Sequence, residues 1–77
     1  MSVRVEDGMI HLTGRCLAED AEALLIALSE GPTRIVELSA VQRMHLAVAQ
    51  ILLAVRPQLR GIPDNPFLAR HLINLLQ

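Results

Sequence analysis

Aromatic residues are almost absent from this chain, which contains Phe67 but neither tryptophan nor tyrosine. Lysine is missing as well, because all seven basic residues are arginine, and the formal net charge is only −1. Domains that bind nucleic acids usually combine a basic stripe with aromatic rings on which the bases stack. We therefore expect no nucleic-acid partner.

Cross-links that stabilise small domains are missing too. Cys16 is the single cysteine, so an internal disulfide is excluded, and the three histidines show no metal-ligand spacing. The chain has 77 residues, which suffices for one domain over residues 1–77. A core of this size rarely supplies more than about 3–5 kcal/mol unaided. We therefore expect a reduced, cytoplasmic protein that forms a homo-oligomer.

Long apolar runs and catalytic motifs are also lacking. The longest apolar stretch, near residues 46–55, is much shorter than the roughly 20 residues of a membrane span, and residues 1–8 lack the apolar run of a signal peptide. No nucleophile elbow, phosphate-cradling glycine loop or paired-acid arrangement appears. These absences predict a soluble chain that is not exported, needs no cofactor and is not an enzyme.

What the sequence does have is aliphatic, since hydrophobic residues make up 52% of it. A β-branched run at residues 35–41 predicts a strand with little water on either face, ended by Gln42-Arg43. The run LAVAQILLAV at residues 46–55 predicts a helix that Pro57 stops. On a helical wheel Leu46 and Leu53 face outward, and the inner stripe comprises Val48, Ile51, Leu52 and Val55.

Residues 2–13 alternate apolar and polar side chains around Asp7-Gly8. Asp-Gly is a preferred two-residue hairpin loop, because both central positions need positive φ. This turn sets three facing pairs: Val3 with Leu12, Arg4 with His11, and Val5 with Ile10. Both apolar pairs then lie on one face of the hairpin. Gly14 is expected to end the second strand.

Residues 17–29 predict a further helix, whose apolar side carries Ala21, Leu24, Leu25 and Leu28. The acids Glu19, Asp20 and Glu22 suit the start of a helix dipole better than a metal or acid–base site, since no histidine or cysteine is placed to join them. Gly31-Pro32 is expected to close this helix.

The C-terminal third is less regular. Residues 58–63 form a short edge strand or a loop, and Pro63 and Pro66 favour the loop. Asp64 or Asn65 is expected to cap a last helix with Pro66 in its first turn. One side of that helix is expected to carry Phe67, Leu68, His71, Leu72, Leu75 and Leu76.

The predicted order is strand, strand, helix, strand, helix, an uncertain segment and helix. A strand, a crossover helix and a parallel strand make a right-handed βαβ unit. We therefore predict an α/β (α+β) fold, in which an N-terminal hairpin precedes the βαβ unit and helices cover one face of a small mixed sheet.

The central strand reads IVELSAV at residues 35–41, and MHLAVA at residues 44–49 opens the next helix. In this order of elements, and in the strand, residues 3–55 resemble the STAS domain shared by sulphate transporters and anti-sigma factor antagonists. The family strand is of the type V-x-L-D-L-S-G-V, which this chain matches, and the family helix opens with D-S-(S/A)-G-L, which it does not. The resemblance implies a STAS-like fold with a shortened C-terminal part.

In that family a Ser or Thr at the start of the second helix is phosphorylated by a partner kinase. The matching position here is Leu46, or Ala47 after a one-residue shift, and no Ser, Thr or Tyr occurs from Ala40 onward. Hydroxyl phosphorylation at this site is thus excluded. His45 replaces the preceding Asp; its imidazole can in principle carry a phosphoryl group, but we prefer a polar surface or cap residue.

The resemblance also assigns roles in the central strand. Glu37 stands where the family has Asp, and we expect it to pair with an arginine. Ser39 stands at a Ser that looks structural in the family, so its hydroxyl is expected to bond the backbone.

No Ser, Thr, Asp or Asn precedes Leu46 to cap the first helical turn, so its free N–H groups could donate hydrogen bonds to a carboxylate of another protein. The expected partner-binding residues are Arg43, His45, Leu46, Gln50 and Leu53. The alternative is that a loop of this chain covers the turn.

We thus expect a non-catalytic, bacterial regulatory module resembling an anti-sigma factor antagonist. The alternatives are an accessory subunit that binds the ATPase of an ABC transporter, and a carrier of small apolar ligands in space beneath Phe67 and the second helix.

Overall fold

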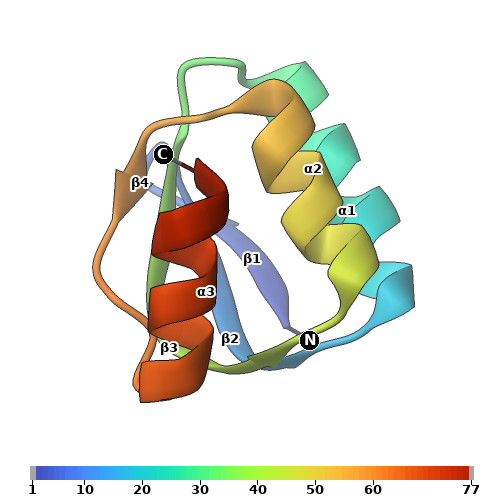
Figure 1. Cartoon of the computed structure of the whole chain (residues 1–77). Helices are drawn as coiled ribbons and strands as arrows, with labels where there is room; N and C mark the ends of the chain where they lie inside the picture. Colours follow the sequence, from blue (N-terminus) through green and yellow to red (C-terminus); the bar gives the residue numbers. More distant parts are fainter. Residues whose placement is uncertain (1, 77) are drawn as a thin grey trace.

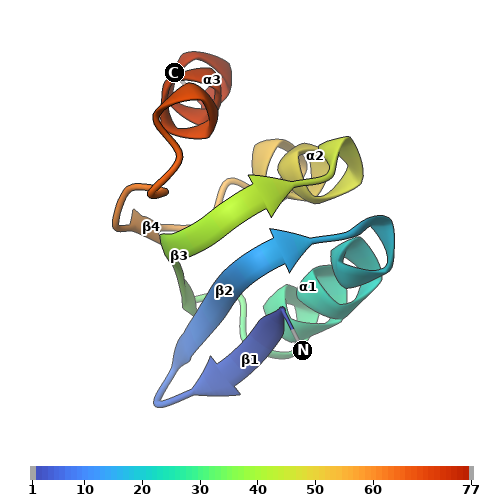
Figure 2. The same ribbon diagram turned by 90° about the horizontal axis from the view of Figure 1, so that it is seen from below.

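The computed structural model describes residues 2–76 as one mixed α/β unit. In chain order the elements are β1 (Val3–Glu6), β2 (Met9–Cys16), α1 (Ala18–Glu30), β3 (Ile35–Met44), α2 (Leu46–Val55), β4 (Leu59–Arg60) and α3 (Pro66–Leu76). The strands form one sheet in the order β1-β2-β3-β4, in which β1 is antiparallel to β2 and the other pairs are parallel. α1 and α2 lie side by side on one face of the sheet, and α3 packs against β3 and α2 (Figures 1 and 2). The expected fold class is confirmed.

The hairpin has the predicted turn and register. Asp7 and Gly8 both have positive φ, at 53° and 77°. Val5 faces Ile10 and Val3 faces Leu12, as the alternation requires. The hairpin is therefore fixed by local sequence, because the loop type sets the pairing of every later residue.

The ends of two strands were predicted wrongly. β2 continues past Gly14 to Cys16, and β3 continues through Gln42-Arg43 to Met44. The pairing of these strands shifts between His11 and Thr13 and again between Gly14 and Arg15. Each shift places one extra residue on β3, and such a bulge turns later side chains to the other face. Polar residues that would end a regular strand are accommodated in this way.

β3 was also expected to exclude water on both faces, and this is wrong. Val36, Leu38 and Val41 are buried against the helices, whereas Ser39 and Ala40 on the opposite side are exposed. The second face of the sheet is open to solvent, as is common when helices cover one side of a sheet.

α1 begins as expected. The Asp20 carboxylate accepts a hydrogen bond of 2.6 Å from the N–H of Leu17, so this acid caps the helix. The buried side comprises Ala21, Leu24, Ala27 and Leu28, whereas Leu25 is 42% exposed. Gly31 ends the helix with φ of −142°, and its N–H bonds the Ala27 carbonyl at 3.1 Å.

α2 occupies the predicted residues, but its buried stripe differs. Val48, Ala49 and Leu52 are buried, whereas Val55 is exposed. The buried stripe is thus rotated toward Ala49, and Val55 was placed wrongly because periodicity alone does not set this rotation. Arg56, with φ of 51°, ends the helix by donating its N–H to the Leu52 carbonyl at 2.8 Å.

The C-terminal segment combines both expected possibilities. Leu59–Arg60 is a two-residue strand beside β3, and the rest of residues 58–63 is irregular. Asn65 caps α3, since its Oδ1 accepts from the N–H groups of Phe67 at 3.0 Å and Leu68 at 3.3 Å. Ala69 and Leu72 are buried, but Phe67 and His71 are exposed, so their expected place on the inner side is wrong. The side chain of Leu76 lies outside the described residues.

The core is aliphatic, as the composition predicts. The fully buried side chains include Ile10, Leu12, Leu24, Val36, Val41, Val48, Leu52 and Cys16. Burial, together with the nearby negative charge of Asp20, raises the pKa of the Cys16 thiol to about 11. This thiol is therefore protonated at neutral pH and is a poor nucleophile.

Gly61→Ala tests the packing of the segment after β4. Gly61 has φ of 80°, and an added Cβ would collide with Glu37 Oε1 and lie 3.0 Å from Ser39 Cβ. We expect the substitution to lower the free energy of unfolding by about 1–3 kcal/mol, measured by urea denaturation. Gly14→Ala is the control, because Gly14 has φ of 63° with nothing near its Cβ position. Equal losses in the two variants would contradict the close contact.

Candidate docking surface at the start of α2

The end of β3 is tied directly to the end of β2. The N–H of His45 donates to the carbonyl of Cys16 at 2.7 Å, immediately before α2 begins. This bond extends the parallel pairing of the two strands to the first residue before the helix. The start of α2 therefore has a fixed position at the carboxyl ends of the parallel strands (Figure 1).

His45 caps α2 with its own side chain. The imidazole Nδ1 accepts a hydrogen bond of 3.0 Å from the N–H of Ala47, and the His45 carbonyl accepts one of 3.0 Å from Val48. The expectation of an uncapped first turn is thus wrong, because an unprotonated ring nitrogen acts as Asn or Ser would. The interpretation of His45 as a polar surface or cap residue is confirmed. A partner's carboxylate is not needed at this turn.

The candidate residues nevertheless lie at the surface. Leu46 is 61% exposed, and Arg43, His45 and Gln50 are exposed as well, whereas Leu53 is half-buried. Positions 46, 50 and 53 are four and three residues apart, so they share one face of the helix. The alternative that a loop covers this turn is wrong within residues 2–76. The structure places Leu46, Gln50 and Leu53 together on one face of α2, with His45 just before them and Arg43 near the end of β3, and we call these five residues the α2 surface.

Two exposed apolar residues near this end were missed as candidates for partner binding. Phe67 is 85% exposed in the first turn of α3, and Leu17, which precedes α1, is exposed too. α2 and α3 begin at the same end of the molecule (Figure 1), where Asn65 Nδ2 donates to the Gln42 carbonyl at 3.3 Å. The polar His71, one turn after Phe67, was the feature of the sequence that could have indicated that this side of α3 faces water.

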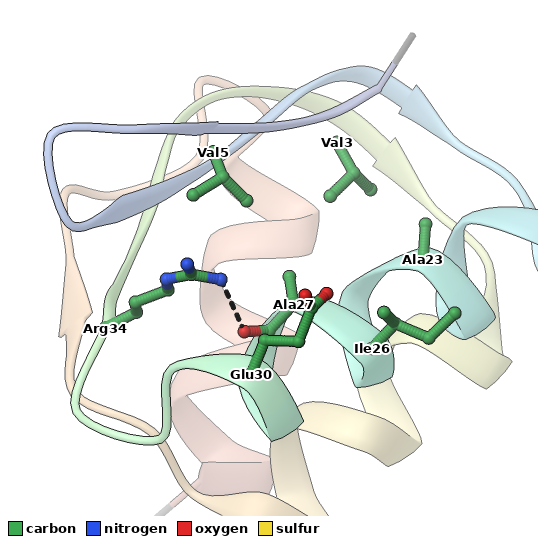
Figure 3. Close-up of a pocket in the computed structure, with 7 residues that line it drawn as sticks. All are labelled: Val3, Val5, Ala23, Ile26, Ala27, Glu30 and Arg34. Carbon is green, nitrogen blue, oxygen red and sulfur yellow. Dashed lines mark hydrogen bonds between the residues drawn. The ribbon is translucent and has the colours of Figure 1, made fainter.

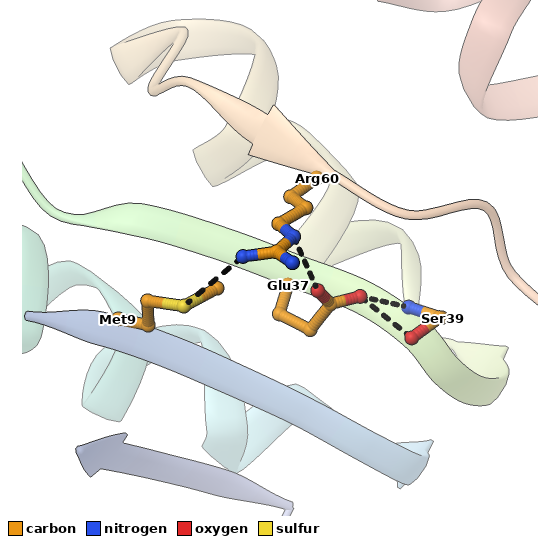
Figure 4. A network of polar contacts seen from close by, with 4 residues as sticks. All are labelled: Met9, Glu37, Ser39 and Arg60. Carbon is orange, nitrogen blue, oxygen red and sulfur yellow. Dashed lines mark hydrogen bonds and ion pairs between the residues drawn. The ribbon is translucent and has the colours of Figure 1, made fainter. Parts of the chain in front are cut away.

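A polar cluster lies on β3 and β4 (Figure 4). The Glu37 carboxylate accepts from the Ser39 hydroxyl at 2.6 Å and the Ser39 N–H at 2.9 Å, and lies 3.7 Å from Arg60. The bonds from Ser39 hold the pKa of Glu37 below its ordinary value, and the Arg60 charge adds to this. The expected arginine partner of Glu37 is thus Arg60, whereas the Ser39 hydroxyl bonds a carboxylate instead of the backbone.

This cluster fits a structural role. Both partners of Glu37 come from the central and edge strands, so the carboxylate links β4 to β3. Because the folded-state pKa is lowered, the stability that Glu37 contributes is present above its unfolded pKa and is lost as the pH falls. No group of three or more potential metal ligands occurs among the residues described.

A hollow of about 290 Å³ lies between β1 and α1, and a second of about 390 Å³ lies beside Ser2 and the start of α1. The first is lined in part by Val3, Val5 and Ile26 (Figure 3). Phe67 and α2 contribute to neither hollow. They therefore give no support to a ligand site beneath Phe67.

Comparisons with protein-family models, curated proteins and solved structures found no match to this chain. The function must therefore be argued from its own residues. Within the described part of the chain, none of the helices is long and apolar enough to cross a membrane.

His45→Ala tests the cap of α2. Loss of the Nδ1 acceptor leaves the Ala47 N–H without its bond, so we expect the free energy of unfolding to fall by about 1 kcal/mol in urea titrations. His45→Asn keeps an acceptor at this position and serves as the control, with stability close to that of the original chain. If both variants lose the same stability, the side-chain cap is not what matters there.

Proposed function

We propose that this chain is a STAS-like, non-catalytic interaction module of the cytoplasm, which binds a regulatory partner protein through the α2 surface. The observation that carries the proposal is the division of α2 into two sides. Val48, Ala49 and Leu52 are buried in the core, while Leu46 is 61% exposed in the first turn. An exposed leucine at a rigidly held position can bury its side chain only against another molecule.

The arrangement of the elements supports the STAS-like part of the proposal. A hairpin, a helix, a parallel central strand and a second helix follow in the order that the resemblance implies. In STAS domains the start of the second helix is the regulated contact, and the corresponding turn here begins with Leu46. The proposal thus rests on the match of strand residues 35–41 and on this topology.

Binding at this turn is constitutive in our proposal. Neither Leu46 nor Ala47 has a hydroxyl group that a kinase can modify. Phosphorylation of a hydroxyl therefore cannot add a negative charge at this position, as it does in STAS domains that are switched in this way. An aliphatic side chain in its place favours a permanent apolar contact.

The chemistry of the α2 surface indicates what a partner must offer. Complete burial of a leucine side chain contributes about 1.5–3 kcal/mol, so Leu46 is the strongest single anchor of this surface. Arg43, near the end of β3, favours an acidic group on the partner, and Gln50 offers hydrogen bonds. The matching partner therefore has an apolar recess with a carboxylate at its rim.

Leu46→Glu tests this function in affinity purification from the native cell, with captured proteins quantified by mass spectrometry. The acid replaces the apolar anchor without touching the core, so we expect a specific partner to fall by roughly tenfold or more in capture. Leu25→Glu is the matched control, since Leu25 is also an exposed leucine of a helix but lies on α1.

Loss with Leu46→Glu but not with Leu25→Glu supports the proposal, and the captured protein then distinguishes a regulator from a transporter ATPase. Equal capture by the two variants, or no partner that depends on Leu46, would refute it.

A further inference from the structure

The β1 edge of the sheet is open, and its backbone points outward at known residues. β1 pairs with β2 on one side and forms the end of the described sheet. The Ser2 carbonyl accepts from the Thr13 N–H at 3.0 Å, so the even-numbered residues direct their backbone groups toward β2. Because these directions alternate along an antiparallel strand, the N–H and C=O groups of Val3 and Val5 face the open edge.

The charges on β1 select one way in which this edge can pair with itself. Arg4 and Glu6 lie on the face opposite the helices, where Arg4 Nε is 3.3 Å from Glu6 Oε2, and both side chains are well exposed. A closed two-fold contact pairs the same strand antiparallel in the two copies. In such a pairing, residues whose backbone groups face the open edge lie opposite each other. Val3 or Val5 of one copy therefore lies opposite Val3 or Val5 of the other copy.

Three registers satisfy this condition, and they differ in charge. Pairing Val3 with Val3 places Arg4 opposite Ser2, and pairing Val3 with Val5 places Arg4 opposite Arg4. Pairing Val5 with Val5 places Arg4 opposite Glu6 twice, once on each side of the two-fold axis. Opposite charges directly across a ladder are favourable and like charges are not. The third register is therefore the complementary one.

The apolar surface beside this edge fits the same register. Val5 is 44% exposed and Ile26 is 52% exposed, and both line the hollow between β1 and α1 (Figure 3). Residues directly opposite in a ladder point to the same face of the sheet. The Val5 side chain of a second copy would thus lie on the helix side, next to this hollow, and would cover its apolar lining.

We propose that β1 is a self-association edge, at which two copies of this chain pair antiparallel with Val5 opposite Val5. The two sheets become one continuous sheet, held by backbone bonds at Val5, two Arg4–Glu6 contacts and apolar contact around Ile26. The strand is short, and interfaces below about 1,200 Å² are usually weak. We therefore expect a dimer that dissociates on dilution and in high salt. This site is separate from the α2 surface and does not depend on the function proposed for it.

The test is a charge exchange measured by sedimentation velocity up to about 1 mM protein. Arg4→Glu leaves two acids on the strand, and Glu6→Arg leaves two arginines. Each variant alone then places like charges opposite each other, so we expect its association to weaken roughly tenfold or more. An equimolar mixture restores opposite charges at both contacts and is expected to form a heterodimer about as well as the original chain dimerises. The double exchange in one chain also restores self-association.

Circular dichroism confirms that each variant is folded, as expected for exposed positions. Restoration in the mixture is the outcome that supports the proposal. A chain that stays monomeric at the highest concentration overturns the proposal. Dimerisation that neither single variant weakens also overturns it, because the contact then lies elsewhere on the molecule.

Discussion

The parallel pairing of β2 with β3 is the constraint on which the rest of the molecule depends. It joins segments separated by α1, and its residues Ile10, Leu12, Val36 and Val41 are completely buried. Parallel strands need an apolar cover, and here α1 and α2 supply it on one face, while α3 packs against β3 and α2. The bond from His45 to Cys16 continues this pairing to the last residue before α2. The position of the α2 surface thus follows from the strand pairing.

Local rules predicted the parts of the fold that local interactions determine. The Asp7-Gly8 turn set the hairpin register, Asp64 or Asn65 together with Pro66 marked the start of α3, and Pro57 followed the end of α2. The bulges between β2 and β3 could not be predicted, because they depend on how the two strands fit together. The exposure of Val55 and Phe67 was missed for a similar reason, since periodicity defines a stripe but not its rotation toward the sheet.

The candidate site was predicted in its position and only partly in its chemistry. Leu46 is exposed, as the helical wheel indicates. The N–H of Ala47, however, donates to the His45 side chain, whereas it was expected to donate to a carboxylate of a partner. Because this cap already satisfies the helix end, burial of the Leu46 side chain contributes more to the proposed binding than electrostatic attraction to the helix end. The β1 edge offers a different kind of contact, through backbone bonds and paired charges. In the proposed assembly the two surfaces remain separate, so a dimer would display the α2 surface twice.

The separation of core and contact residues within α2 can be measured directly by urea unfolding of two alanine variants. Leu52→Ala removes a completely buried side chain and is expected to cost about 2–5 kcal/mol, enough to unfold a domain of this size. Leu46→Ala removes an exposed side chain and is expected to change the free energy of unfolding by no more than about 0.5 kcal/mol. A loss at Leu46 equal to that at Leu52 would place Leu46 in the core and contradict its role as a contact residue.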